Sequence, residues 1–164
     1  MTPHDIVLKP RGVRFMGRHF PVSIGKAGRV QEKSEGDGGT PIGQLRVAQI
    51  FYRPDRVPCP APWAIPIGPR DLWCDAPAHE NYNHLVKAPF AHSHEQMRRA
   101  DPLYDIVITT DWNWPDATPG AGSAIFLHQW RRPGYPSEGC LAFKRSDISW
   151  IARQVHPGTR IITL

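Results

Sequence analysis

The stretch "SAIFLHQWRRPGYPSEGCLAF", residues 123–143, contains two short apolar segments joined by a polar loop. The first segment, 123–128, ends in a histidine, His128, and the second, 140–143, begins with a cysteine, Cys140. Short apolar runs bounded by turn residues are typical of buried strands, and the prolines and glycines between them favour a loop. The stretch therefore predicts strand, loop and strand, with the loop closing over a sheet edge and returning the cysteine to face the histidine.

The rest of the chain also indicates a mainly β fold. Among 164 residues there are 18 prolines and 14 glycines, which makes long helices improbable. Residues 25–43 read as a polar, glycine-rich loop, and residues 53–69 as an irregular segment anchored by Trp63 and Ile65. Further strands are predicted at residues 5–8, 13–24 (with a hairpin turn at Gly17-Arg18), 44–52, 104–110 and 160–164.

Two short helices complete the prediction. One is polar and covers residues 92–100; the other begins at Ser146 as N-cap and ends at Val155. The second carries an apolar stripe that includes Ile148, Ile151 and Ala152. Without repeats, low-complexity segments or a linker, residues 1–164 are expected to form a single β-sandwich or barrel-like domain.

Charge and hydropathy limit the function classes. Lys and Arg number 20 and Asp and Glu 15, a formal net charge of +5 that favours acidic partners. One alternative is therefore a non-catalytic module that binds anionic glycan or nucleic acid, although the basic residues are scattered and no nucleic-acid-binding motif is present. No apolar run approaches the roughly 20 residues of a membrane span, and the first residues lack the features of a signal peptide.

The three cysteines are Cys59, Cys74 and Cys140. An odd count excludes a fully paired framework. Cys59 and Cys74 are expected to be small packing residues, with a bridge between them as the alternative. Cys140 is free in either case.

Cys140 has the surroundings of a nucleophile. A thiolate needs a nearby imidazole or backbone donors to form at neutral pH, and His128 is the candidate imidazole. Gly139 permits a sharp turn, so that the N–H groups of Gly139 and Cys140 can point at one spot as an oxyanion hole. A cysteine paired with one of eight histidines is common, however, so this pattern alone leaves catalysis open.

Two motifs together resemble the YkuD-type L,D-transpeptidase family. "SAIFLHQW…PSEGCLAF" is similar to that family's histidine and Ser/Thr-His-Gly-Cys signature, and "EGDGGTPIGQLRV" resembles its earlier Gly-x-x-Thr-Pro-x-Gly segment. The resemblance extends from about residue 25 to the C-terminus. It implies a cell-wall enzyme in which a cysteine attacks a stem-peptide carbonyl of peptidoglycan, and an amine from a second stem resolves the thioester into a cross-link.

Within this resemblance, Cys140 is the expected nucleophile and His128 the general base and later acid. The backbone carbonyl of Gln129 is expected to orient the imidazole, and Gly139 to supply an oxyanion donor. No metal or organic cofactor is implied. A zinc site built from His92, His94, His128 and Cys140 was the weaker interpretation, since the spacing is not that of a zinc motif.

The sequence departs from the family pattern at three points. The segment between His128 and Cys140 is short, Glu138 replaces the usual histidine, and Ala142 stands where Arg or Asn is common. A carboxylate at that position is expected to change the donor, giving links from the first residue of one stem to the third of the next, rather than between two third residues. The same thioester resolved by water would make the protein a cysteine L,D-carboxypeptidase instead.

The expected substrate-binding residues are Ser137, Glu138, Arg131, Arg132 and His94. The two arginines suit stem-peptide carboxylates, and His94 is expected to face the site from the helix at 92–100. The expected partners are donor and acceptor stem peptides, with the protein a monomer without a membrane span. The substrate places the protein in the periplasm or cell envelope.

Overall fold

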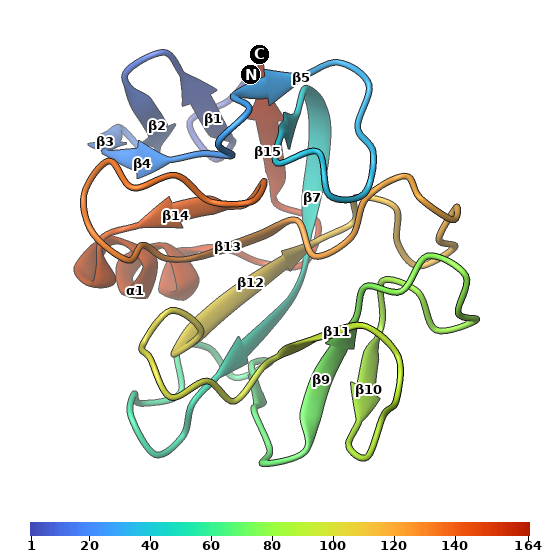
Figure 1. Ribbon diagram of the computed structural model, residues 1–164. Helices are drawn as coiled ribbons and strands as arrows, with labels where there is room; N and C mark the ends of the chain where they lie inside the picture. Colours follow the sequence, from blue (N-terminus) through green and yellow to red (C-terminus); the bar gives the residue numbers. More distant parts are fainter.

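Strands from both ends of the chain pair with each other in the main sheet of the computed structural model, which describes residues 1–164 (Figure 1). β1 (Ile6–Lys9) runs parallel to β15 (Arg160–Thr163), and β7 (Gly43–Tyr52) lies on the other side of β15. The strand order is β3-β2-β1-β15-β7-β12-β13-β14-β4, with β8 (Ile65–Pro66) branching from β7. The other strands are β2 (Gly12–Phe15), β3 (Arg18–Phe20), β4 (Val22–Ser23), β12 (Ile106–Thr110), β13 (Phe126–Gln129) and β14 (Leu141–Phe143).

The two ends of this order are joined by one residue. β3 pairs with β2, β4 pairs with β14, and only Pro21 separates β3 from β4. Proline has no N–H for a strand ladder, so the segment breaks at Pro21 and each half pairs with a different strand. The main sheet therefore nearly closes on itself, which confirms the mainly β, barrel-like prediction. The β2–β3 turn lies at Met16-Gly17, both with positive φ (47° and 74°), one residue before the predicted position.

α1 (Arg145–Gln154) packs against the core of this sheet. Its predicted apolar stripe is confirmed, since Ile148, Ile151 and Ala152 are buried together with side chains of β13 and β14. The predicted N-cap is wrong: the cap position is Lys144, which makes no side-chain capping bond, and the helix begins before Ser146.

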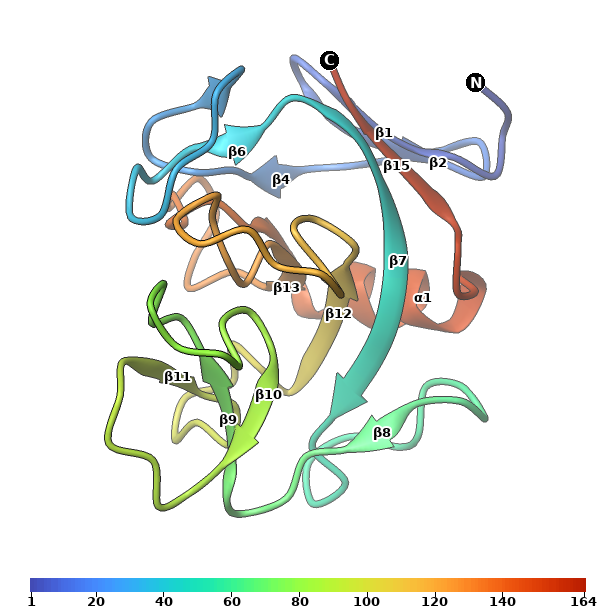
Figure 2. The same cartoon turned by 90° about the vertical axis from the view of Figure 1, so that its right-hand side faces the viewer.

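A second sheet, missed in the sequence, lies against the main one (Figure 2). Its order is β10-β9-β11, with β9 (Asp71–Cys74) in the centre between β10 (Leu85–Lys87) and β11 (His94–Gln96). The helix predicted over 92–100 is therefore wrong. Long-range pairing of β11 with the fully buried β9 outweighs the local polar pattern. Two short strands, β5 (Arg29–Val30) and β6 (Thr40–Pro41), pair within the glycine-rich loop.

All three cysteines are free. Cys74 is completely buried, as a packing residue would be, whereas Cys59 is exposed. The bridge between them, and the packing role of Cys59, were therefore wrong. No helix of the structure has both the length and the apolar character needed to span a bilayer.

Candidate active site

The alternation of side chains along β13 and β14 puts His128 and Cys140 on the same face. The two strands are parallel, with Leu127 paired to Leu141 and His128 to Ala142. Leu127 and Leu141 point into the main core. His128 and Cys140, one position away along each strand, therefore point to the opposite face, toward the second sheet.

On that face the two side chains line one pocket of about 320 Å³. Its wall also includes Glu95 from β11, Tyr104 from the segment before β12, and Trp130. Cys140 packs in a second apolar cluster with Phe126 and Tyr104. Cys140 is buried, with 9% of the residue exposed, and it forms part of the lining of the pocket.

The imidazole of His128 is held in one orientation. Its Nδ1 lies 2.7 Å from the carbonyl oxygen of Gln129, the partner named from the sequence. A carbonyl can only accept, so Nδ1 carries the proton and Nε2 has the free lone pair. The Tyr104 ring packs edge-on against the imidazole, with centroids 5.3 Å apart. Burial lowers the pKa of His128 to about 4, although the Gln129 carbonyl opposes this shift. His128 is thus a neutral base at pH 7.

The thiol of Cys140 is neutral in this resting state. Its Sγ lies 3.0 Å from the carbonyl oxygen of Ala124, to which it donates, and accepts from the N–H of Phe126 at 3.4 Å. Burial, followed by the negative charge of Glu95, raises the pKa of Cys140 to about 12. No hydrogen bond joins Sγ to His128. The thiol hydrogen is thus directed at the carbonyl of Ala124 in this structure.

The glycine-rich loop fixes the backbone beside the nucleophile. The Thr40 hydroxyl, completely buried, donates to the carbonyl of Gly139 at 2.8 Å and accepts from the N–H of Gly25 at 2.9 Å. Gly139 has φ +142°, and a Cβ there would lie 2.8 Å from the carbonyl oxygen of Gly39. This close approach explains why position 139 needs glycine, and it brings the two sequence motifs into contact.

The backbone donors at this turn differ in availability. The N–H of Gly139 already donates to the Ser137 hydroxyl at 3.2 Å, and that hydroxyl donates to the carbonyl of Cys140 at 2.6 Å. The N–H of Cys140 makes no hydrogen bond within the protein. Of the two donors named from the sequence, the N–H of Cys140 is the one free to meet an oxyanion.

The predicted substrate-binding residues divide into two groups. Arg131, Ser137 and Glu138 line the pocket, whereas Arg132 and His94 do not. The Glu138 carboxylate is 2.7 Å from Lys26 at the exposed rim and does not orient His128. His94 is on the wrong side of β11, because neighbouring residues of a strand point to opposite faces; its neighbour Glu95 lines the pocket instead.

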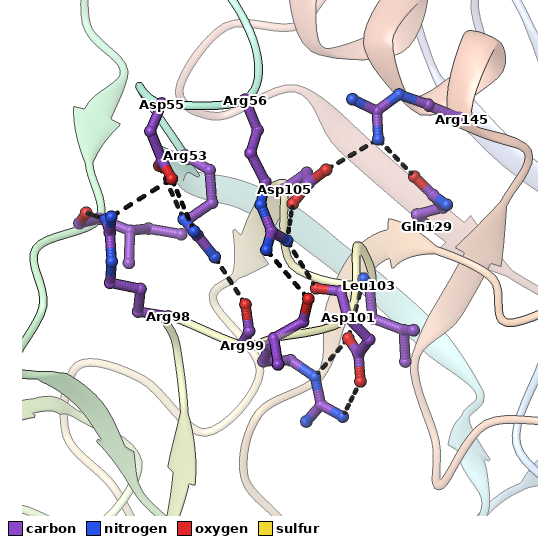
Figure 3. Close-up of polar contacts among 12 residues, drawn as sticks. Arg53, Asp55, Arg56, Arg98, Arg99, Asp101, Leu103, Asp105, Gln129 and Arg145 are labelled. Atoms are coloured by element: carbon purple, nitrogen blue, oxygen red, sulfur yellow. Dashed lines mark hydrogen bonds and ion pairs between the residues drawn. The ribbon is translucent and has the colours of Figure 1, made fainter.

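An ion-pair network supports the pocket wall (Figure 3). Asp105, nearly fully buried, accepts from Arg56 at 3.0 Å and from Arg145 at 2.8 Å. Arg99 binds Asp101 through two bonds of 2.9 and 2.7 Å. The network joins the end of β7 and the start of α1 to the segment that carries Tyr104. The sequence predicts Tyr104 and Asp105 only as the first residues of a strand over 104–110, and only the tertiary structure shows that Tyr104 lines the pocket and that Asp105 supports it.

Cys59 is exposed and Cys140 is buried, so we expect the two cysteines to react at different rates. With an alkylating reagent such as iodoacetamide at pH 7, we expect Cys59 to be modified much faster than Cys140, because Cys140 is a buried thiol with a pKa of about 12. Peptide mapping by mass spectrometry over time measures both rates in one sample. Equal rates for the two residues would contradict the resting geometry described above.

Comparison with known proteins gives one family. The family profile described as YkuD, the L,D-transpeptidase catalytic domain, matches residues 8–163. Among solved structures, the chain is similar to an L,D-transpeptidase from Mycobacterium smegmatis, with a TM-score of 0.41 and 17% identity. That alignment covers 93% of this chain and 52% of the other, so this chain spans about half of that structure's length. No curated protein matches. Because the family profile extends over nearly all residues, the chain belongs to the YkuD family of L,D-transpeptidase catalytic domains.

Proposed function

We propose that this protein is a peptidoglycan L,D-transpeptidase that works through a thioester on Cys140. Nε2 of His128 takes the thiol proton as Sγ attacks a stem-peptide carbonyl carbon, and the N–H of Cys140 donates to the developing oxyanion. When the intermediate collapses, the C–N bond breaks and the proton on His128 passes to the leaving amine. The amine of a second stem then attacks the thioester, which frees Cys140 and forms the cross-link.

One observation carries this proposal: the thiol of Cys140 and the neutral imidazole of His128, whose Nδ1 is fixed by Gln129, line the same pocket. An acyl transfer needs a nucleophile and a base with a free lone pair within one cavity. The pocket requires neither a metal nor an organic cofactor for these steps. Since the substrate is cell-wall peptide, we place the enzyme outside the cytoplasmic membrane.

Glu138, at the rim of the pocket, supports an acyl donor different from the one that the family signature implies. Glu138 has an exposed carboxylate at the mouth, in a position where the family signature has histidine. The Glu138 carboxylate is paired with Lys26 at 2.7 Å, so an ion pair borders the mouth where the signature has an imidazole, and the groups that contact the donor differ accordingly. We infer that the acyl donor is cleaved after the first stem residue, and that the product links this residue to the third residue of the acceptor.

Purified disaccharide peptides with defined stems test this function. We expect the enzyme to convert them into dimers, and fragmentation by tandem mass spectrometry to place the link at the first donor residue. Dimers linked only between third residues would refute the donor assignment but keep the transpeptidase. Shortened monomers without dimers would show that the protein is a hydrolase rather than a transpeptidase. Unchanged peptides that remain bound would indicate a binding module.

A further inference from the structure

Glu95 is an acidic side chain in the pocket that the steps above do not use. It is partly buried on β11, and the hydroxyl of Tyr104 donates to its carboxylate. Arg99 lines the same pocket, but its guanidinium is occupied by two bonds to Asp101. No Lys, Arg or His forms an ion pair with Glu95. Glu95 is thus a carboxylate of the pocket that forms no ion pair within the protein.

The surroundings of Glu95 add to this imbalance. Burial contributes most to raising the pKa of Glu95, and the negative charges of Asp75 and Glu35 raise it further, whereas the hydrogen bond from Tyr104 and the positive charge of Arg99 oppose the shift. Oδ1 of Asp75 is buried and has no hydrogen-bond partner. Buried carboxylates are normally paired with a cation, so Glu95, which forms no ion pair within the protein, is suited to a positively charged ligand that enters the pocket.

Glu95 also acts on the nucleophile itself, because its charge is the second cause of the raised pKa of Cys140. Glu95 and Cys140 line the same pocket, so a cation bound by Glu95 would lie in the cavity that holds the thioester. In the transfer reaction, the positively charged group that must reach the thioester is the ammonium of the acceptor.

We propose that Glu95, held by Tyr104, binds the primary ammonium group of the acyl acceptor and takes its proton before the amine attacks. This inference rests on the proposed function. One proton moves from the ammonium nitrogen to a carboxylate oxygen of Glu95, which leaves a neutral amine. The amine nitrogen bonds to the thioester carbon, the C–S bond breaks, and the second amine proton passes through His128 to Sγ. The products are an amide and the Cys140 thiol, and Glu95 later returns its proton to water.

Measuring acyl-enzyme formation and acyl transfer to the acceptor separately distinguishes the proposed role of Glu95 from that of Cys140. We expect Glu95→Gln to form the acyl-enzyme at least as fast as the unaltered protein, because the variant removes a negative charge that opposes ionisation of Cys140. The same variant should transfer the acyl group to an amine acceptor about a hundredfold more slowly, and intact mass follows both steps. Tyr104→Phe keeps the carboxylate and is expected to show a smaller loss. Glu32→Gln, at an exposed carboxylate that does not line the pocket, is the matched control and should transfer normally.

Hydroxylamine distinguishes a chemical role from a structural one. It is an uncharged nucleophile at neutral pH and needs no carboxylate to remove a proton first. We expect Glu95→Gln to release its acyl group to hydroxylamine as fast as the unaltered protein does. Equal losses toward both nucleophiles, a slower acylation step, or unchanged transfer to the amine would each overturn the inference. If the unaltered protein forms no acyl-enzyme, the proposed function itself fails.

Discussion

Replacement of Cys140 with alanine is expected to abolish both the acyl-enzyme and the dimeric product. No other nucleophile in the pocket can replace the sulfur, because His128, Tyr104 and Glu95 all have partners that fix them in other roles. Intact mass after incubation with stem peptide should show no added acyl group, and product analysis should show only starting material. The expected loss is complete within detection.

The matched control for this variant is Cys59→Ala. Cys59 is exposed and lies outside the pocket, so this variant should form the acyl-enzyme and the dimer at the normal rate. Since Cys140 packs beside Phe126 and Tyr104, the thermal unfolding of both variants should be compared first. A well-folded Cys140→Ala protein that still produced dimers would refute the thioester mechanism.

Replacement of His128 with glutamine is expected to reduce kcat/KM for acylation by a factor of about 10² to 10⁴, the usual contribution of a general base. The thiol of Cys140, with its pKa of about 12, cannot ionise appreciably at neutral pH without a proton acceptor beside it. The rate of acyl-enzyme formation by rapid-quench mass spectrometry measures the effect. His156→Gln, at an exposed histidine beyond α1, should acylate normally.

His128→Gln is also expected to change how the free energy of unfolding depends on pH. Because the pKa of buried His128 is about 4, against 6.5 for the ordinary group, the unfolded chain binds a proton in this interval and the folded chain does not. Stability from this residue is present above pH 6.5 and lost as pH falls toward 4, by about 3 kcal/mol in all. Chemical denaturation at pH 7 and pH 4.5 should show a smaller acid loss in His128→Gln. An equal loss in both proteins would mean that His128 titrates normally.

The common face of His128 and Cys140 could be predicted from the sequence because the signal is local. Apolar runs end at His128 and begin at Cys140, and the parallel pairing of β13 and β14 brings them to one face. The apolar stripe of α1 is equally local. For such segments, side-chain period and turn residues are sufficient to predict the element.

The other side of the pocket could not be read in this way. β11 is three residues long and polar, and it forms only because β9 pairs with it across the second sheet. The predicted helix over 92–100 placed His94 toward the site. In the observed strand, neighbouring side chains point to opposite faces, and Glu95 rather than His94 lines the pocket. The sequence also could not show that the N–H of Gly139, predicted as an oxyanion donor, already donates to the Ser137 hydroxyl. That bond depends on where the hydroxyl lies in the folded loop.

The hydrogen bond from the Cys140 thiol to the Ala124 carbonyl affects how readily the sulfur of Cys140 is oxidised. Peroxide attacks thiolates, and a buried, protonated sulfur presents very little of that form. Between turnovers the enzyme should thus resist conversion to sulfenic acid and mixed disulfides, even where the medium is oxidising. Susceptibility would appear only while substrate draws the proton away, so that bound peptide, rather than the compartment, determines when the sulfur is vulnerable.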